Sequence, residues 1–182
     1  MAYIIFLNGT SSSGKSTLAR EIQKQVDIPF WHVASDQLVE AGMLPKRVND
    51  GGEFDWKINR PKFFNAFHSC IKSILLADNN IILDHIIESQ EWFKELQQEL
   101  SEFDMFFVGV HCPLHIIQQR EEQRSDRNIG NRYLGEAEYH LRHVHTYSPY
   151  DFEVDTSKLS IEKTAGKVIK KWKTRSQSEF FK

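Results

Sequence analysis

The feature that most constrains this chain is a short glycine-containing segment near its start. It matches the pattern G-x-x-x-x-G-K-[ST] without deviation, in the order Gly9, Thr10, Ser11, Ser12, Ser13, Gly14, Lys15 and Ser16. An apolar run at 3–7 precedes it, and a segment of helical periodicity at 15–26 follows it. Because a strand before and a helix after are the context in which this pattern cradles phosphate groups, we expect a strand–loop–helix unit here.

The residue types in this loop suit a polyphosphate. Glycine lets the backbone wrap closely, so that successive amide groups and the positive end of the next helix face the phosphates. The Lys15 ammonium group is expected to reach the β and γ phosphates, and the Ser16 hydroxyl to coordinate a bridging Mg²⁺. Thr17 is a candidate contact of the α phosphate. The sequence therefore predicts binding of ATP with Mg²⁺, and an accidental glycine-rich turn is the disfavoured alternative.

Short apolar runs alternate with longer helical patterns along the rest of the chain. Strands are predicted at 3–7, 30–34, 81–84, 105–111 and 151–155. Helices are predicted at 15–26, 61–77, 89–100, 113–124, 133–144 and 160–172. Pro61 is expected in the first turn of its helix, where a missing amide donor costs nothing. The alternation predicts an α/β fold, a five-stranded parallel sheet flanked by helices on both faces.

Length and composition narrow the class of protein further. A chain of 182 residues suits one domain, expected over 1–175, with a C-terminal tail at 176–182 that frays. The net charge of −2 gives no global attraction to nucleic acid, and the lysines at 163–173 are interpreted as a solvated helix face. No apolar run approaches the roughly 20 residues that cross a bilayer. We expect a cytoplasmic protein without a membrane or nucleic-acid partner.

Two acidic residues follow predicted strands, at the edge of the sheet where the phosphate loop lies. Asp36 is a candidate base that accepts the proton of an incoming hydroxyl group. The alternative is that Asp36 or Ser35 only caps a helix that begins near Gln37. Asp84 is a candidate Mg²⁺ ligand, or otherwise only a polar strand end, and the neighbouring His85 is expected to line the same cleft.

Arginines gather after the fourth predicted strand. Arg120, Arg124 and Arg127 are spaced by four and three, which places them along one helical stripe. Together with the glycine-containing segment that follows, they predict a lid at about 120–135 that closes over the phosphates and neutralises their charge. Glu121 and Glu122 support the alternative of an ordinary mixed-charge surface helix.

Histidines and aromatic residues suggest weaker candidates. His140, His143 and His145 have a spacing that can bring two imidazoles together, but no cysteine or repeated carboxylate completes a metal-ligand set. Structural or pocket-lining roles are therefore preferred for them. The aromatic residues at 54–67 are mostly assigned to the core, with one or two as an apolar wall for a ring-bearing substrate.

Taken together, these features resemble the chloramphenicol phosphotransferase family of P-loop kinases over nearly the whole chain. The resemblance is carried by residues 4–9 with the phosphate loop, Asp36, and residues 51–55, 109–112, 120–127, 144–145 and 150–156. It implies a shikimate-kinase-like arrangement, ATP with Mg²⁺, and phosphorylation of a primary hydroxyl group with Asp36 as base. It also implies that Arg120 lies against adenine and that Arg127 acts catalytically near the transferred phosphate.

One departure from the family leaves the acceptor open. His85 stands where the family's resistance enzyme has a second acidic residue, and the loop before Pro61 also differs. The predicted activity is therefore transfer of the γ phosphate of ATP to a hydroxyl group of a small molecule, resembling chloramphenicol 3-O-phosphotransferase. The alternatives are a kinase of another metabolite, such as a nucleotide, a sugar or a nucleotide sugar as in zeta-toxin-like proteins, and a non-catalytic ATP-binding regulator.

Overall fold

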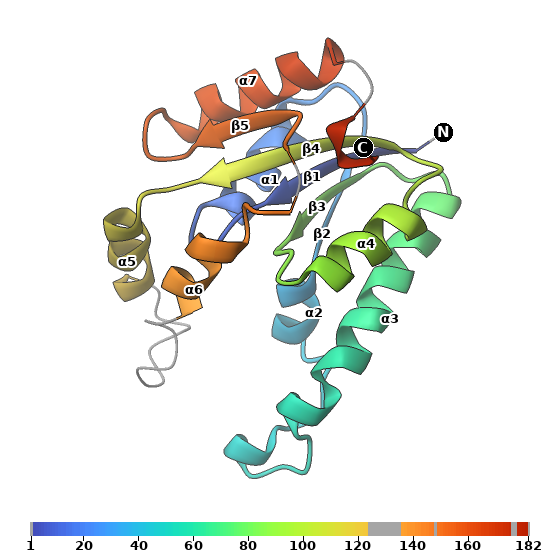
Figure 1. The fold of residues 1–182 in the computed structure, drawn as a ribbon, viewed down its shortest axis with the longest axis vertical. Helices are drawn as coiled ribbons and strands as arrows, with labels where there is room; N and C mark the ends of the chain where they lie inside the picture. Colours follow the sequence, from blue (N-terminus) through green and yellow to red (C-terminus); the bar gives the residue numbers. More distant parts are fainter. Residues whose placement is uncertain (1, 124–135, 148, 176–177, 182) are drawn as a thin grey trace.

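The computed structural model describes residues 2–123, 136–147, 149–175 and 178–181. Strands and helices alternate along it (Figure 1). In chain order they are β1 (Tyr3–Asn8), α1 (Lys15–Gln25), β2 (Trp31–Ala34), α2 (Ser35–Glu40), the 3-10 turn η1 (Val48–Asp50), α3 (Trp56–Leu76), β3 (Ile81–His85), α4 (Gln90–Glu99), β4 (Asp104–His111), α5 (Leu114–Glu122), α6 (Glu136–His143), β5 (Phe152–Asp155), α7 (Ile161–Lys173) and the 3-10 turn η3 (Glu179–Phe181). The predicted α/β class and its strands are confirmed.

The strands form one parallel sheet in the order β2-β3-β1-β4-β5. β1 occupies the centre, where Ile4, Ile5, Phe6 and Leu7 are fully buried. A strand with this nearly continuous apolar sequence needs cover on both of its faces, and the centre of a parallel sheet provides it. In Figure 1 the arrows of the strands point toward α5 and α6, so the loops after β1, β2 and β3 meet at one edge of the sheet.

Alternate residues of β1 pack into different helical layers, as the two-residue period of a strand requires. Ile5 belongs to the cluster formed with α1 and α7, which includes Leu18 and Val168. Phe6 belongs to the cluster on the other face, formed with α3 and α4. The prediction of helices on both faces is therefore confirmed. Within the described residues, no helix combines the length and the apolar character that crossing a membrane would require.

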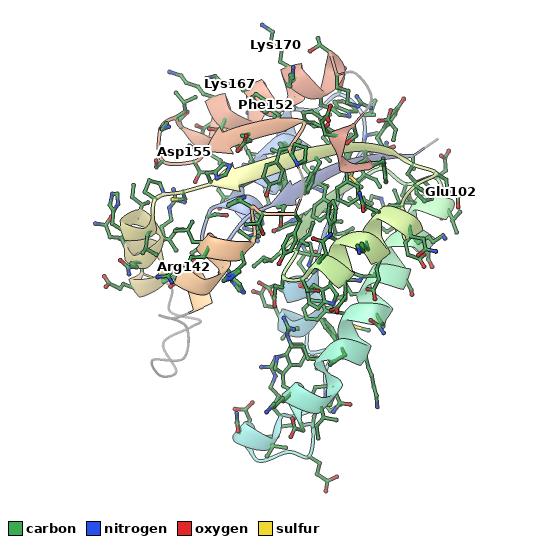
Figure 2. All side chains as sticks on the ribbon, viewed as in Figure 1. Glu102, Arg142, Phe152, Asp155, Lys167 and Lys170 are labelled. Atoms are coloured by element: carbon green, nitrogen blue, oxygen red, sulfur yellow. The ribbon has the colours of Figure 1, made fainter. Side chains whose placement is uncertain are left out.

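α3 begins earlier than the sequence pattern predicts. The Asp55 side chain accepts a hydrogen bond from the Ile58 amide at 3.2 Å, so Asp55 is the N-cap and Trp56 the first helical residue. Pro61 consequently lies inside the helix and not in its first turn, which makes that prediction wrong. The start of α3 projects away from the sheet together with the segment before it (Figure 1), and it carries its side chains with it (Figure 2).

The prediction of a frayed C-terminal tail is wrong for residues 178–181. Phe180 is fully buried, with its ring centroid 4.8 Å from that of Phe107 and 5.1 Å from that of Phe93. The Asp151 carboxylate accepts hydrogen bonds from the Ser178 hydroxyl at 2.6 Å and from the Glu179 amide at 2.5 Å. An apolar ring and a pair of charge-assisted hydrogen bonds thus dock this segment on the sheet.

Candidate active site

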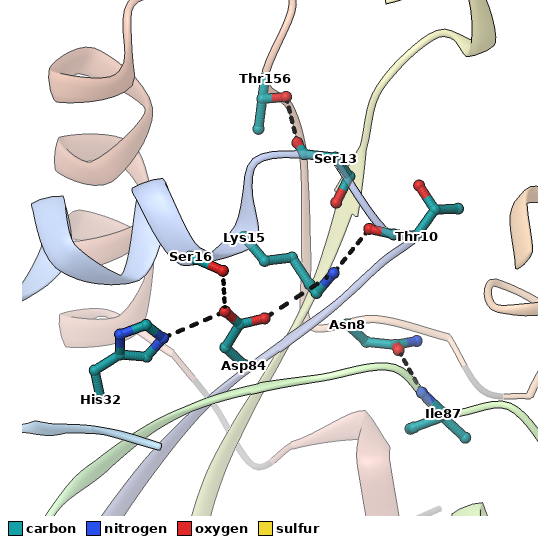
Figure 3. Close-up of polar contacts among 9 residues, drawn as sticks. All are labelled: Asn8, Thr10, Ser13, Lys15, Ser16, His32, Asp84, Ile87 and Thr156. Carbon is teal, nitrogen blue, oxygen red and sulfur yellow. Dashed lines mark hydrogen bonds and ion pairs between the residues drawn. The ribbon is translucent and has the colours of Figure 1, made fainter. Parts of the chain in front are cut away.

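The predicted phosphate loop connects β1 to α1 in a backbone conformation that depends on glycine. Gly14 has a φ of 96°, in the left-handed region that glycine adopts without steric cost. A Cβ atom at Gly9 would lie 2.3 Å from the carbonyl oxygen of Val110, a backbone atom that cannot move aside alone. Asn8 fixes the end of β1, since its Oδ1 accepts from the Ile87 amide at 3.0 Å (Figure 3).

The functional groups of the loop converge on one carboxylate of β3 (Figure 3). The Ser16 hydroxyl donates to Asp84 Oδ2 at 2.6 Å. Lys15 Nζ lies 4.0 Å from Asp84 Oδ1 and donates to the carbonyl oxygen of Thr10 at 2.8 Å. Asp84 is only 7% exposed. The register of the sheet explains the convergence, because Asp84 pairs with Leu7 at the end of the central strand.

Asp84 remains a carboxylate despite its burial. Burial raises its pKa, but the hydrogen bond from His32, the positive charge of Lys15 and the hydrogen bond from Ser16 together lower it below its usual value. A carboxylate beside a hydroxyl group provides the hard oxygen donors that Mg²⁺ prefers. Among the described residues there is no group of three or more His, Cys, Asp or Glu that could hold a metal ion. A Mg²⁺ here would therefore take its other ligands from phosphate oxygens and water.

Residues from two distant elements hold the loop from outside. The Thr156 hydroxyl, just after β5, donates to the carbonyl oxygen of Ser13 at 2.6 Å. Arg120 of α5 donates from Nη1 to Thr156 Oγ1 at 3.0 Å and from Nη2 to the Thr156 carbonyl oxygen at 3.2 Å. Arg120 Nη1 also donates to the carbonyl oxygen of Ser12 at 3.4 Å, so the structure brings the predicted Arg120 to the loop. The sequence indicated Thr156 only as part of the segment that carries the family resemblance.

A cavity of about 680 Å³ opens beside the loop. Among the residues that line it are Ser11, Ser12, Gly14, Lys15, Ser16, Thr17, Asp36, Asp84, His85 and Arg120. The remaining loop residues, Gly9, Thr10 and Ser13, are buried and do not line the cavity. Candidates for each of the three predicted roles, phosphate binding, metal binding and proton transfer, therefore face one common space.

Asp36 lies on α2 and does not cap it. The N-cap of α2 is Ala34, whose amide donates to Gln37 Oε1 at 3.1 Å. Ser35 and Asp36 are the first residues of the helix, so the interpretation that either of them is the cap is wrong. The Asp36 side chain is exposed and lines the cavity. Its role as a base stays a prediction.

His85 lines the same cavity but is buried against aromatic rings. Its ring stacks on Trp92 with centroids 5.7 Å apart, and its Nε2 lies 3.2 Å from Nε2 of His68. Burial, together with the neighbouring His68, holds the pKa of His85 well below its ordinary value. The ring is therefore neutral at physiological pH, and it forms a wall of the cavity with Phe64.

The other histidines contact protein groups. His140 Nε2 lies 3.8 Å from Glu88 Oε1, and His145 Nδ1 lies 2.7 Å from the Tyr150 hydroxyl. Burial, the largest effect, lowers the pKa of His145 to about 4. Two side chains of the site that the sequence did not indicate are Glu88, which lines the cavity and pairs with Arg60, and His32.

Part of the predicted lid lies outside the described residues. This applies to Arg124 and Arg127 and to residues 124–135 as a whole. The described start of the predicted lid is the end of α5, where Arg120 lies. The roles of Arg124 and Arg127 accordingly stay predictions.

Comparisons with known proteins confirm the family resemblance that the sequence shows. Residues 2–173 match the family model "Chloramphenicol phosphotransferase-like protein". A Mycobacterium tuberculosis protein named "Putative O-phosphotransferase" is 30% identical, in an alignment that covers 89% of this chain and 78% of the relative.

Solved structures share the fold at lower sequence identity. The APS kinase of Mycobacterium tuberculosis, in complex with AMPPNP and APS, is 18% identical and superposes with a TM-score of 0.65, covering 94% of this chain and 98% of the kinase. The shikimate kinase of Acinetobacter baumannii, in complex with shikimate, is 14% identical with a TM-score of 0.59, covering 93% and 92%. From the family match and this P-loop kinase fold, we conclude that the chain belongs to the chloramphenicol phosphotransferase-like family and is a small-molecule kinase.

Proposed function

We propose that this protein transfers the γ phosphate of ATP to a hydroxyl group of a small molecule. The observation that carries the proposal is the convergence of Lys15 and Ser16 on Asp84, with the Lys15 ammonium group 4.0 Å and the Ser16 hydroxyl 2.6 Å from that carboxylate. Asp36 faces the same cavity from α2. A phosphate-binding cation and a carboxylate that can accept a proton thus share one space, as phosphoryl transfer to an alcohol requires.

Each group has a role that its chemistry supports. Ser16 and Asp84 would hold Mg²⁺, which supplies positive charge to the phosphate oxygens when it is bound. The Lys15 ammonium group binds the terminal phosphates and stabilises the charge that develops on them. Arg120 donates from Nη1 to the carbonyl oxygen of Ser12 in the loop at 3.4 Å and lines the same cavity, so its positive charge is available to the nucleotide.

Asp36 acts on the acceptor. Its carboxylate takes the proton of the acceptor hydroxyl group as the oxygen attacks the γ phosphorus. A new bond forms between that oxygen and phosphorus, the bond from phosphorus to the β–γ bridging oxygen breaks, and ADP leaves. Phe64 and Ile86 provide apolar surface in the same cavity for the non-reacting part of the acceptor.

The direct test is a screen of hydroxyl-bearing acceptors, chloramphenicol among them, for the ATP-dependent mass gain of one phosphoryl group. We expect Lys15→Ala to abolish all nucleotide-dependent activity. Asp36→Asn should lower turnover by about 10²–10⁴, the range expected for general base catalysis, with a much smaller change in ATP affinity. Asp50→Asn is the matched control, because Asp50 is an exposed aspartate of η1 that does not line the cavity.

Two outcomes would count against the proposal. Normal turnover by Asp36→Asn would remove Asp36 as the base. Mg²⁺-dependent ATP binding without a phosphorylated product from any acceptor would favour the nucleotide-dependent regulator.

A further inference from the structure

His32 of β2 joins two parts of the active site that the proposed mechanism treats separately. Its side chain is only 6% exposed, and its Nε2 lies 3.3 Å from Asp84 Oδ2 (Figure 3). That same carboxylate oxygen accepts the hydrogen bond from Ser16. On the other side of the ring, Nδ1 lies 3.1 Å from Nε2 of Gln37. The imidazole therefore bridges a candidate metal ligand and α2.

The chemistry of the partners sets the direction of every hydrogen bond in this chain of contacts. The Asp84 carboxylate can only accept, so His32 Nε2 carries a proton and donates it. Nδ1 then accepts from the amide group of Gln37, and Gln37 Oε1 accepts from the Ala34 amide at 3.1 Å. Each donor meets an acceptor, so the contacts are compatible with one arrangement of the ring and the side-chain amide.

The last bond of the series lies at the N-terminus of α2. Gln37 Oε1 satisfies the Ala34 amide at the start of the helix, as the third residue of a capping box does. Asp36 directly precedes Gln37 on the same first turn. The position of the Asp36 backbone therefore depends on a side chain whose other end is bonded to His32.

We propose that His32 and Gln37 are positioning residues that couple occupancy of the nucleotide site to the placement of Asp36. We call the hydrogen-bonded series Asp84–His32–Gln37–Ala34 the relay. Asp84 connects the relay to the phosphate-binding groups, and the first turn of α2 is the element whose position changes. The inference rests on the proposed function, in which Asp36 is the base. Neither His32 nor Gln37 needs to touch the reacting atoms, since a displaced base is enough to slow the reaction.

Three substitutions separate the two ends of the relay. His32→Gln can keep a donor near the Nε2 position but loses the acceptor that faces Gln37. His32→Asn can keep an acceptor near the Nδ1 position but loses the bond to Asp84. Gln37→Met removes the amide and keeps the length of the side chain, at a half-buried position where a folded protein is expected. Gln98→Met, at an exposed position of α4, is the matched control.

The kinetic test compares kcat with the KM for ATP. We expect each of the three variants to lower kcat by about tenfold, equivalent to about 1.4 kcal/mol, with a smaller change in the KM for ATP. The double variant of His32→Gln and Gln37→Met should be no slower than the worse single variant, because both break the same relay. Additive losses, or a wild-type kcat for His32→Gln, would overturn the inference.

A second measurement is independent of turnover. We expect binding of the Mg²⁺ complex of AMPPNP to slow amide hydrogen exchange at residues 34–38 in the wild type, and the three variants to lose this response. If the variants keep it, the relay does not couple the two sites. Normal turnover of Asp36→Asn with an intact exchange response would instead refute the proposed base and leave the coupling standing.

Discussion

Truncation of Phe180 is the most direct test of the C-terminal segment that the structure docks on the sheet. The Phe180 ring is fully buried, and its centroid lies 5.8, 5.1 and 4.8 Å from those of Phe6, Phe93 and Phe107. Replacing a buried phenylalanine by alanine costs about 3–5 kcal/mol, from lost transfer free energy and from the cavity that is left. We expect Phe180→Ala to destabilise the protein by about this amount.

The assay is urea unfolding followed by both tryptophan fluorescence and far-UV circular dichroism, so that a two-state transition can be checked. In a thermal melt of a chain of this size, the same loss of unfolding free energy corresponds to a fall in Tm of roughly 10 °C. Leu76→Ala is the control, because Leu76 is a large apolar residue that is 63% exposed. It should change the free energy of unfolding by less than about 0.5 kcal/mol.

The opposite result would be informative. A Phe180→Ala protein within about 0.5 kcal/mol of the wild type would mean that residues 178–181 contribute little to the folded state. Such a result would favour the frayed tail that the sequence alone predicts. A large loss at Phe180 and a negligible loss at Leu76 would show that the end of the chain is part of the core.

Two further predictions concern the phosphate loop and the buried His68. Gly9→Ala should destabilise the protein by about 1–3 kcal/mol and weaken ATP binding, because the added Cβ atom would lie 2.3 Å from the Val110 carbonyl oxygen. Thermal melting measures the stability and calorimetric titration the ATP affinity. An unchanged ATP affinity would contradict the reasoning. Burial lowers the pKa of His68 from 6.5 to about 4, so this group contributes stability above pH 6.5 that is lost as the pH falls toward 4. Between pH 7 and pH 5 the loss from His68 should be about 2 kcal/mol, and urea unfolding of His68→Gln should show a correspondingly weaker dependence on pH.

Local sequence patterns were sufficient for much of the fold and for the phosphate loop. The loop motif is contiguous, and its backbone requirements are carried by Gly9 and Gly14 themselves. The apolar runs of the central strands are local signals as well. The sequence pattern does not locate the start of α3. Asp55 is an ordinary capping residue, but Pro61 is also a common first-turn residue, and the pattern does not distinguish the two possible starts.

Tertiary structure decided which partners the polar residues around the loop have. His32, Asp84 and Thr156 lie on or just after three different strands, and no spacing along the chain relates them. The strand order β2-β3-β1-β4-β5 brings them to one edge of the sheet, around Ser13 and Ser16 of the loop. A single polar residue carries no sign of its partner, so the relay through His32 could not be read from the sequence.

The same distinction applies to the C-terminus. Residues 180–181 are two phenylalanines without any periodic pattern, and the burial of Phe180 depends on side chains from β1, α4 and β4. The sequence by itself determined that this chain builds a parallel sheet with a phosphate loop, since those signals are local and repeated. Only the folded chain decided what packs on that sheet and what surrounds the loop, because such contacts join residues that are far apart in the sequence.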